Sequence, residues 1–103
     1  MNKYKIQLSK TNNDNNDQLT LSGELSINHI DLIKDEIESL INIDSPYKII
    51  VKDADIIDLS LIQLLLSLKN LNPKSEIHLV LNDEMMGLIN ISGFKNLFNM
   101  KTN

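Results

Sequence analysis

The chain has 103 residues, of which 42% are hydrophobic and 23% charged, which suits one folded core but not two. Its formal net charge is -4 and its basic residues are scattered lysines without any arginine, which argues against a nucleic-acid-binding surface. It contains no cysteine, which excludes disulfides and thiolate metal sites. No apolar run approaches the roughly 20 residues of a membrane span and the N-terminus lacks a signal-peptide core, so we expect a soluble, cytoplasmic protein.

The N-terminal part is expected to form a β-hairpin. Residues 3–9 alternate between apolar and polar side chains, which indicates a half-buried strand. Residues 12–17 are all Asn or Asp and are too polar to pack, so we expect a flexible turn there. Residues 18–25 resume the alternation, with Gly23 as a break, and complete the hairpin.

The next segment is expected to be an amphipathic helix. It starts at Ser26 or Asn28, because both side chains are good N-caps. Its apolar residues recur at helical spacing, with charged residues on the outer side. The residues predicted to face inward are Ile30, Ile33, Ile37, Leu40 and Ile41.

The segment from residue 47 to residue 71 organises the rest of the chain. Residues 47–51 are predicted to be a buried strand, followed by an acidic turn and a helix over about 59–71. The acidic turn contains Asp53, Asp55 and Asp58. We expect Asp58 to be the N-cap, because its carboxylate can accept hydrogen bonds from the free amides of the first helical turn.

The helix over residues 59–71 is apolar except for one narrow stripe. Its polar positions before Lys69 are Ser60, Gln63 and Ser67, spaced i, i+3 and i+7 on one side of the helix. We therefore expect a mostly buried helix that exposes this stripe at its N-terminal end. That thin face is the candidate site.

The remaining chain is predicted to add a strand and a short helix. Residues 76–81 alternate, with the apolar side chains at positions 77, 79 and 81 on one face. Asn82 or Asp83 caps a helix over residues 84–91, which Gly93 can end in the left-handed conformation. A short apolar segment over residues 94–100 closes the chain.

These elements follow the order ββαβαβα. They predict an α/β fold with a mixed sheet of about four strands and with helices packed mainly on one face. We expect one domain over residues 1–103, in which residues 1–18 form the first strand and the polar loop, and residues 19–98 form the core.

The layout and four local strings resemble the STAS family, the small domain of anti-sigma-factor antagonists that also occurs at the cytoplasmic end of sulfate transporters. The resemblance extends over residues 19–98. The four strings are LSGELSI at 21–27, YKIIVKDADIID at 47–58, LSLIQLLLSLKNL at 59–71 and ISGFKNLF at 91–98. The resemblance implies a STAS-like fold and a bacterial protein that acts in signalling and transcription regulation.

One departure from the family concerns its phosphorylation motif. In the signalling members, the residue that corresponds to Asp58 is followed by a phosphorylatable Ser or Thr, a small residue and a Gly. Here the phosphoacceptor position carries Leu59, which has no hydroxyl, so the resemblance implies a degenerate phosphosite. Ser60 is the alternative acceptor, although one residue along a helix turns a side chain by about 100°.

Other chemistry finds less support in the sequence. The alternative to an interaction module is a small ligand- or metal-binding protein that uses Asp53, Asp55 and Asp58, but no calcium-loop spacing accompanies them. His29, expected on the exposed first turn of a helix, and His78, on a strand face, have no motif partner. Met85, Met86 and Met100 are predicted to fill the core. We therefore expect no catalytic residues, no metal site and no cofactor.

The sequence thus predicts a non-catalytic protein-interaction module. Its predicted partner-binding residues are Asp58, Leu59, Ser60, Gln63 and Ser67. The resemblance implies that the partner is a kinase-like anti-sigma factor, and the alternative is that the chain is a small subunit of a lipid-transport ATPase. We expect neither nucleic-acid binding nor membrane insertion. The protein is predicted to be a monomer or a weak homodimer, since the edge strand over residues 3–9 could pair with a second copy.

Overall fold

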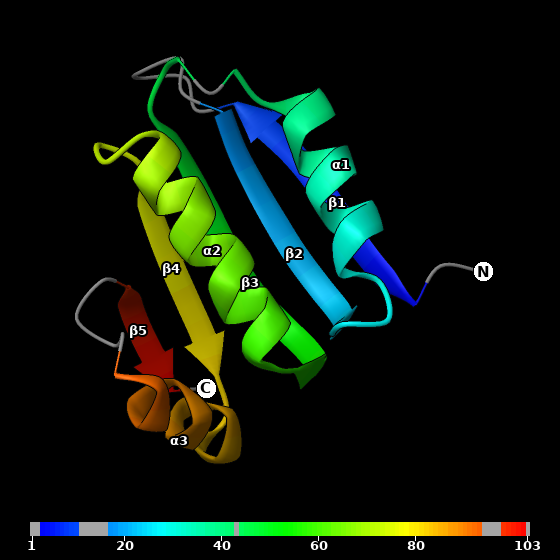
Figure 1. Ribbon diagram of the computed structural model, residues 1–103, viewed down its shortest axis with the longest axis vertical. Helices are drawn as coiled ribbons and strands as arrows, with labels where there is room; N and C mark the ends of the chain where they lie inside the picture. Colours follow the sequence, from blue (N-terminus) through cyan, green and yellow to red (C-terminus); the bar gives the residue numbers. More distant parts are fainter. Residues whose placement is uncertain (1–2, 11–16, 43, 94–97, 103) are drawn as a thin grey trace.

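Strands and helices alternate along the part of the chain that the computed structural model describes, which is residues 3–10, 17–42, 44–93 and 98–102. The elements are β1 (Tyr4–Lys10), β2 (Asp17–Leu25), α1 (Ile30–Leu40), β3 (Tyr47–Ile57), α2 (Leu59–Leu71), β4 (Glu76–Leu81), α3 (Asp83–Ser92) and β5 (Asn99–Thr102). Figure 1 shows α1 and α2 lying over one face of the sheet, with α3 beside the end of β4.

The strands form one sheet in the order β1-β2-β3-β4-β5. β1 is antiparallel to β2, and every other neighbouring pair is parallel. The predicted α/β class, mixed sheet and one-sided helices are confirmed, and the hairpin of β1 and β2 forms as expected. The structure adds β5, which the sequence pattern did not distinguish from an apolar closing segment. Residues 12–16 of the predicted turn and residues 94–97 of the closing segment lie outside the described residues, whereas Asp17, predicted to be in the turn, is the first residue of β2.

The core lies between the sheet and the helices that cover it. The register pairs Ile6 with Leu21, Leu21 with Val51, and Val51 with Leu79, so a row of apolar side chains crosses β1 to β4 beneath the helices. The other large side chains that are fully buried are Leu19, Leu25, Ile33, Ile37, Ile49, Leu61, Ile62, Leu65, Leu68 and Ile77. The strand positions between them, such as His78, are half-buried or exposed, so the predicted alternation is confirmed.

The start of α1 differs from the prediction. The helix begins at Ile30 with His29 at the N-cap position, and no side chain caps it. Ser26 is buried, and its carbonyl accepts a hydrogen bond from the His29 N–H at 2.9 Å. Neither Ser26 nor Asn28 therefore caps the helix, because residues 26–29 form a separate turn between β2 and α1.

The predicted acidic turn is also corrected, because most of it belongs to β3. This strand continues to Ile57, which pairs with Leu25 at the end of β2. The pairing of β2 with β3 shifts register twice after Leu21. At each shift β3 has one more residue than the part of β2 that it faces, near Asp53 and near Asp55. Asp53 has a φ of 52°, which is unusual for a residue other than Gly and typical of a bulge.

The later elements form as predicted. The structure confirms α2 over residues 59–71 with its N-cap at Asp58, and β4 over residues 76–81. Asn82 caps α3, since its side chain accepts a hydrogen bond from the Met85 N–H at 2.9 Å. Gly93 ends α3 in the left-handed conformation, with a φ of 81°.

Gly23 lies where β2 passes close to β1 and where its register with β3 shifts. Its φ is 90°, and a Cβ atom placed there would lie 2.4 Å from the carbonyl oxygen of Lys3. That same oxygen accepts a hydrogen bond from the Glu24 N–H at 2.8 Å, so it cannot move away freely. Only glycine fits this position without strain.

We predict that Gly23→Ala lowers the free energy of unfolding by about 1–3 kcal/mol, through an unfavourable φ and a clash with the backbone of β1. The control is Gly87→Ala, because a Cβ at Gly87 meets nothing within 4 Å inside α3. Alanine should stabilise that helix by about 0.5–1 kcal/mol. Urea denaturation measures both values, and a Gly23→Ala variant as stable as the wild type would contradict the prediction.

Candidate functional site

The candidate site is built around the carboxylate of Asp58, between β3 and α2. One of its oxygens, Oδ1, accepts hydrogen bonds from the Ser60 N–H at 3.0 Å and from the Ser60 hydroxyl. The other oxygen, Oδ2, accepts the Ile27 N–H at 2.9 Å. Asp58 therefore caps α2, as predicted, and also fastens the connection between β2 and α1 to the start of that helix.

These contacts also keep Asp58 ionised. Burial raises the pKa of its carboxyl and is the largest single effect. The hydrogen bonds from Ser60, from the Ile27 N–H and from the Leu61 N–H together outweigh burial, so the pKa lies below its ordinary value of 3.8. The N-terminal end of α2 thus carries a negative charge at neutral pH.

The polar stripe of α2 lies at the surface. Gln63 and Ser67 are exposed and Ser60 is half-buried, whereas Leu61, Leu64, Leu65 and Leu68 are buried against the sheet. The Ser60 hydroxyl donates a hydrogen bond to Asp58, so Gln63 and Ser67 are the exposed members of the stripe. The structure therefore brings the predicted site residues onto one side of the helix.

A shallow depression of about 520 Å³ surrounds the start of α2. Its lining combines Asp58, Leu59, Ser60 and Gln63 with three apolar residues from other elements, Ile27, Ile57 and Leu88. Ile27 is 67% exposed and Leu59 is 55% exposed, so two of the exposed large apolar side chains of the described residues line the same depression.

Sequence reasoning missed Ile27, Ile57 and Leu88 as site residues. Ile27 stands in the turn before α1, out of phase with the helical pattern that follows it. Parallel pairing of β2 with β3 places the ends of both strands at one edge of the sheet, and this brings Ile27 to Asp58. The one available signal was an apolar residue in a polar turn, just after a strand predicted to join the sheet.

The alternative site at the acidic segment is not assembled. Asp53 and Asp55 are exposed in the C-terminal half of β3, whereas the carboxylate of Asp58 caps α2. Within the described residues, no group of three or more His, Asp or Glu side chains could hold a metal ion. The three carboxylates therefore do not form the cation site that the alternative hypothesis requires.

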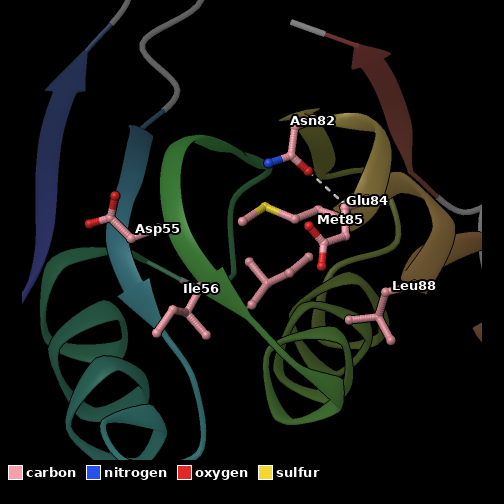
Figure 2. Close-up of a pocket in the computed structure, with 7 residues that line it drawn as sticks. Asp55, Ile56, Asn82, Glu84, Met85 and Leu88 are labelled. Carbon is pink, nitrogen blue, oxygen red and sulfur yellow. Dashed lines mark hydrogen bonds between the residues drawn. The ribbon is translucent and has the colours of Figure 1, made fainter.

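A second depression, of about 390 Å³, lies between the end of β3 and the first turns of α3. Figure 2 shows Asn82, Glu84, Met85 and Leu88 on one side of β3, whereas the side chain of Asp55 points away from them. Asn82 is engaged in capping α3. This depression adjoins the first, because Ile57 and Leu88 line both.

The two histidines lie apart from the start of α2. The His29 Nε2 contacts Glu24 Oε2 at 2.6 Å, and its ring lies 5.7 Å from the ring of Tyr4. His29 was expected on an exposed first turn, but it is only 22% exposed because Tyr4 and Glu24 pack against it. His78 lies on a strand face, as expected, 3.9 Å from Glu76.

The methionines near α3 serve the core in part. Met85 and Met86 are half-buried and pack against the core cluster, which agrees with their predicted role. The side chain of Met100 lies outside the described part of the structure.

No helix among the described residues has the length and apolar character needed to span a membrane.

We predict that Asp58→Ala lowers the free energy of unfolding by about 1–2 kcal/mol at neutral pH, as loss of an N-cap does. The folded-state pKa of Asp58 lies below its ordinary value, so the stabilisation is present above about pH 4 and is lost as the pH falls through the folded-state pKa. The difference in the free energy of unfolding between Asp58→Ala and wild type, measured by urea denaturation, should therefore become smaller below about pH 4.

The control for this prediction is Asp35→Ala, at an exposed position of α1. It should change the free energy of unfolding by less than about 0.5 kcal/mol at any pH. A difference between Asp58→Ala and wild type that stays constant down to the lowest measurable pH would show that the ionised carboxylate is not the stabilising group.

The sequence matches no protein-family model and no curated protein. Solved structures do resemble it. A Thermotoga maritima protein provisionally assigned as an anti-sigma factor antagonist matches with a TM-score of 0.70 and 13% identity, over 95% of this chain and 86% of that one. An uncharacterised protein from Shewanella loihica with a SpoIIAA-like fold matches with a TM-score of 0.55 and 14% identity, over 97% of this chain and 85% of that one. At these identities the likeness establishes the fold alone, and the chain has a SpoIIAA-like fold.

Proposed function

We propose that the chain is a non-catalytic protein-interaction module of the anti-sigma-factor-antagonist type, which binds a protein partner through the N-terminal end of α2. The observation that carries this proposal is the pair of exposed apolar side chains, Ile27 and Leu59, held beside the Asp58 cap. The likeness to a protein provisionally assigned as an anti-sigma factor antagonist supports it.

The energetics of this surface favour association. Covering a largely exposed Ile or Leu side chain removes apolar area from water and is worth about 1–2 kcal/mol each. Ile27 and Leu59 supply that term, and Gln63 and Ser67 beside them offer hydrogen-bonding groups to a partner. An apolar centre with a polar rim is the usual composition of a protein–protein interface.

We further propose that this surface works without the usual phosphorylation switch. Leu59 occupies the position that the signalling members of the family phosphorylate, and it has no acceptor oxygen. Ser60 is the nearest hydroxyl, and it donates its hydrogen bond to Asp58. A phosphate there would add about -1.5 to -2 charges beside an ionised carboxylate, so phosphorylation of Ser60 would break the cap.

The partner itself is best sought by affinity capture from the native cell. A kinase-like anti-sigma factor is the partner that the proposal favours. A transport ATPase recovered instead would assign the chain to the subunit role that the STAS resemblance also allows. Phosphopeptide mapping of the captured chain tests the second part of the proposal, because a phosphate found on Ser60 in the bound protein would contradict it.

We predict that Leu59→Asp weakens binding of the captured partner at least about tenfold, because it places a charge in a partly apolar contact that becomes desolvated. Ser60→Asp should act in the same direction, since it adds a charge and disturbs the Asp58 cap. Dissociation constants can be measured by calorimetry with the purified partner.

The matched control is Leu71→Asp, at the other end of α2. Leu71 is 51% exposed, close to the 55% of Leu59, and it lies outside the depression. This variant receives the same substitution on the same helix and should bind as the wild type does. Equal affinities for wild type, Leu59→Asp and Leu71→Asp would place the partner elsewhere on the molecule.

A further inference from the structure

The depression at the start of α2 belongs to a longer groove. It shares Ile57 and Leu88 with the depression beside α3. On its other side it shares Ile27, Ser60 and Gln63 with a depression of about 200 Å³ between α1 and α2. We call this continuous surface the three-helix groove. It extends from the first turns of α3, across the start of α2, to Ser67.

The floor of the three-helix groove is apolar. Ile27 and Leu59 are its most exposed apolar side chains, and Ile30, Ile57 and Leu88 are half-buried beside them. From Leu59 to Ser67, α2 alone contributes a length of about 12 Å. An occupant of this groove therefore needs several apolar side chains in a row rather than a single anchor.

The charged side chains that line the groove are mainly acidic. Asp31 lines it from α1, Asp58 from the start of α2 and Glu84 from α3. Lys34 is the basic residue among the described lining residues. Asp55 also borders the groove, but its side chain points away in Figure 2.

The helix ends reinforce this charge pattern. Helix N-termini normally attract anions through their free N–H groups and their dipole. Here each of these ends already has its own acidic group: Asp31 in the first turn of α1, Asp58 as the cap of α2, and Glu84 in the first turn of α3. A phosphate or another carboxylate approaching the groove would therefore meet negative charge at each helix end.

We propose, on the basis of the proposed function, that the occupant of the three-helix groove is a basic amphipathic segment of a protein partner. Its apolar side chains would cover Ile27 and Leu59. Its Lys or Arg side chains would lie next to Asp31 on the α1 side of the groove and next to Glu84 on the α3 side. Charge complementarity of this kind raises the association rate and rejects acidic competitors.

The test uses two synthetic peptides of equal length with the same apolar residues at i, i+3, i+4 and i+7. One peptide has Lys and the other has Glu at the remaining positions. Each is titrated into the isotopically labelled protein while amide NMR signals are followed. The Lys peptide should shift the signals of Ile27, Ser60 and Gln63, and its binding should weaken at high salt. The Glu peptide should leave them unchanged.

A matched pair of double variants tests the charges. Asp31→Asn with Glu84→Gln removes two charges from the groove and should weaken binding of the Lys peptide about fivefold, as the loss of two exposed ion pairs does. Asp44→Asn with Glu76→Gln removes two exposed charges where β3 and β4 begin, at the opposite end of these strands from the start of α2. This control should bind like the wild type. Equal losses in both double variants would reduce the effect to net charge and overturn the proposal.

The outcomes separate this inference from the proposed function. If Leu59→Asp abolishes binding of the native partner, but the Lys peptide shifts no groove signals or shifts those of another face, the interaction module stands and the basic segment is wrong. Equal binding of the Lys and Glu peptides would also overturn the basic segment. If, in addition, the native partner binds Leu59→Asp as tightly as it binds the wild type, both the interaction module and the basic segment are wrong.

Discussion

The geometry of the candidate site depends on a single carboxylate. Asp58 satisfies the first free amides of α2 with one oxygen and holds the Ile27 N–H with the other. It thereby joins two segments that lie 31 residues apart in sequence. Hydrogen bonds to a charged acceptor are stronger than bonds between neutral groups. The turn that carries Ile27 is thus held beside Leu59, and both side chains remain exposed.

Strand pairing brings these two segments within reach of each other. β2 and β3 run parallel and end together, with Leu25 beside Ile57. The extra residues of β3 near Asp53 and Asp55 let its pairing with β2 continue to that point, and Gly23 keeps β2 bonded to β1 where the register with β3 shifts. These irregularities turn Ala54 rather than Asp53 toward the core, and they determine where the strands end. The position of the site therefore follows from the sheet as much as from α2.

Local patterns were sufficient for the elements whose causes are local. The extent of α2 and its cap at Asp58 follow from a Leu-rich periodicity and from N-cap chemistry, both visible in a few residues. The start of α1 could not be predicted from local patterns. The Ile27 N–H is bonded to the distant carboxylate of Asp58, and residues 26–29 form a turn in which neither Ser26 nor Asn28 caps the helix. For the same reason, Ile27 could not be assigned to the site: its role depends on a contact between strands.

The same contacts bear on what kind of chemistry the site can perform. A carboxylate that accepts the bonds of Ser60 and Ile27 has little capacity left to act as a general base or to coordinate a cation. What the protein presents at the start of α2 is a shallow, fixed and partly apolar surface. Under the proposed function this surface recognises another protein surface, and its selectivity would come from shape and charge rather than from an enclosed pocket.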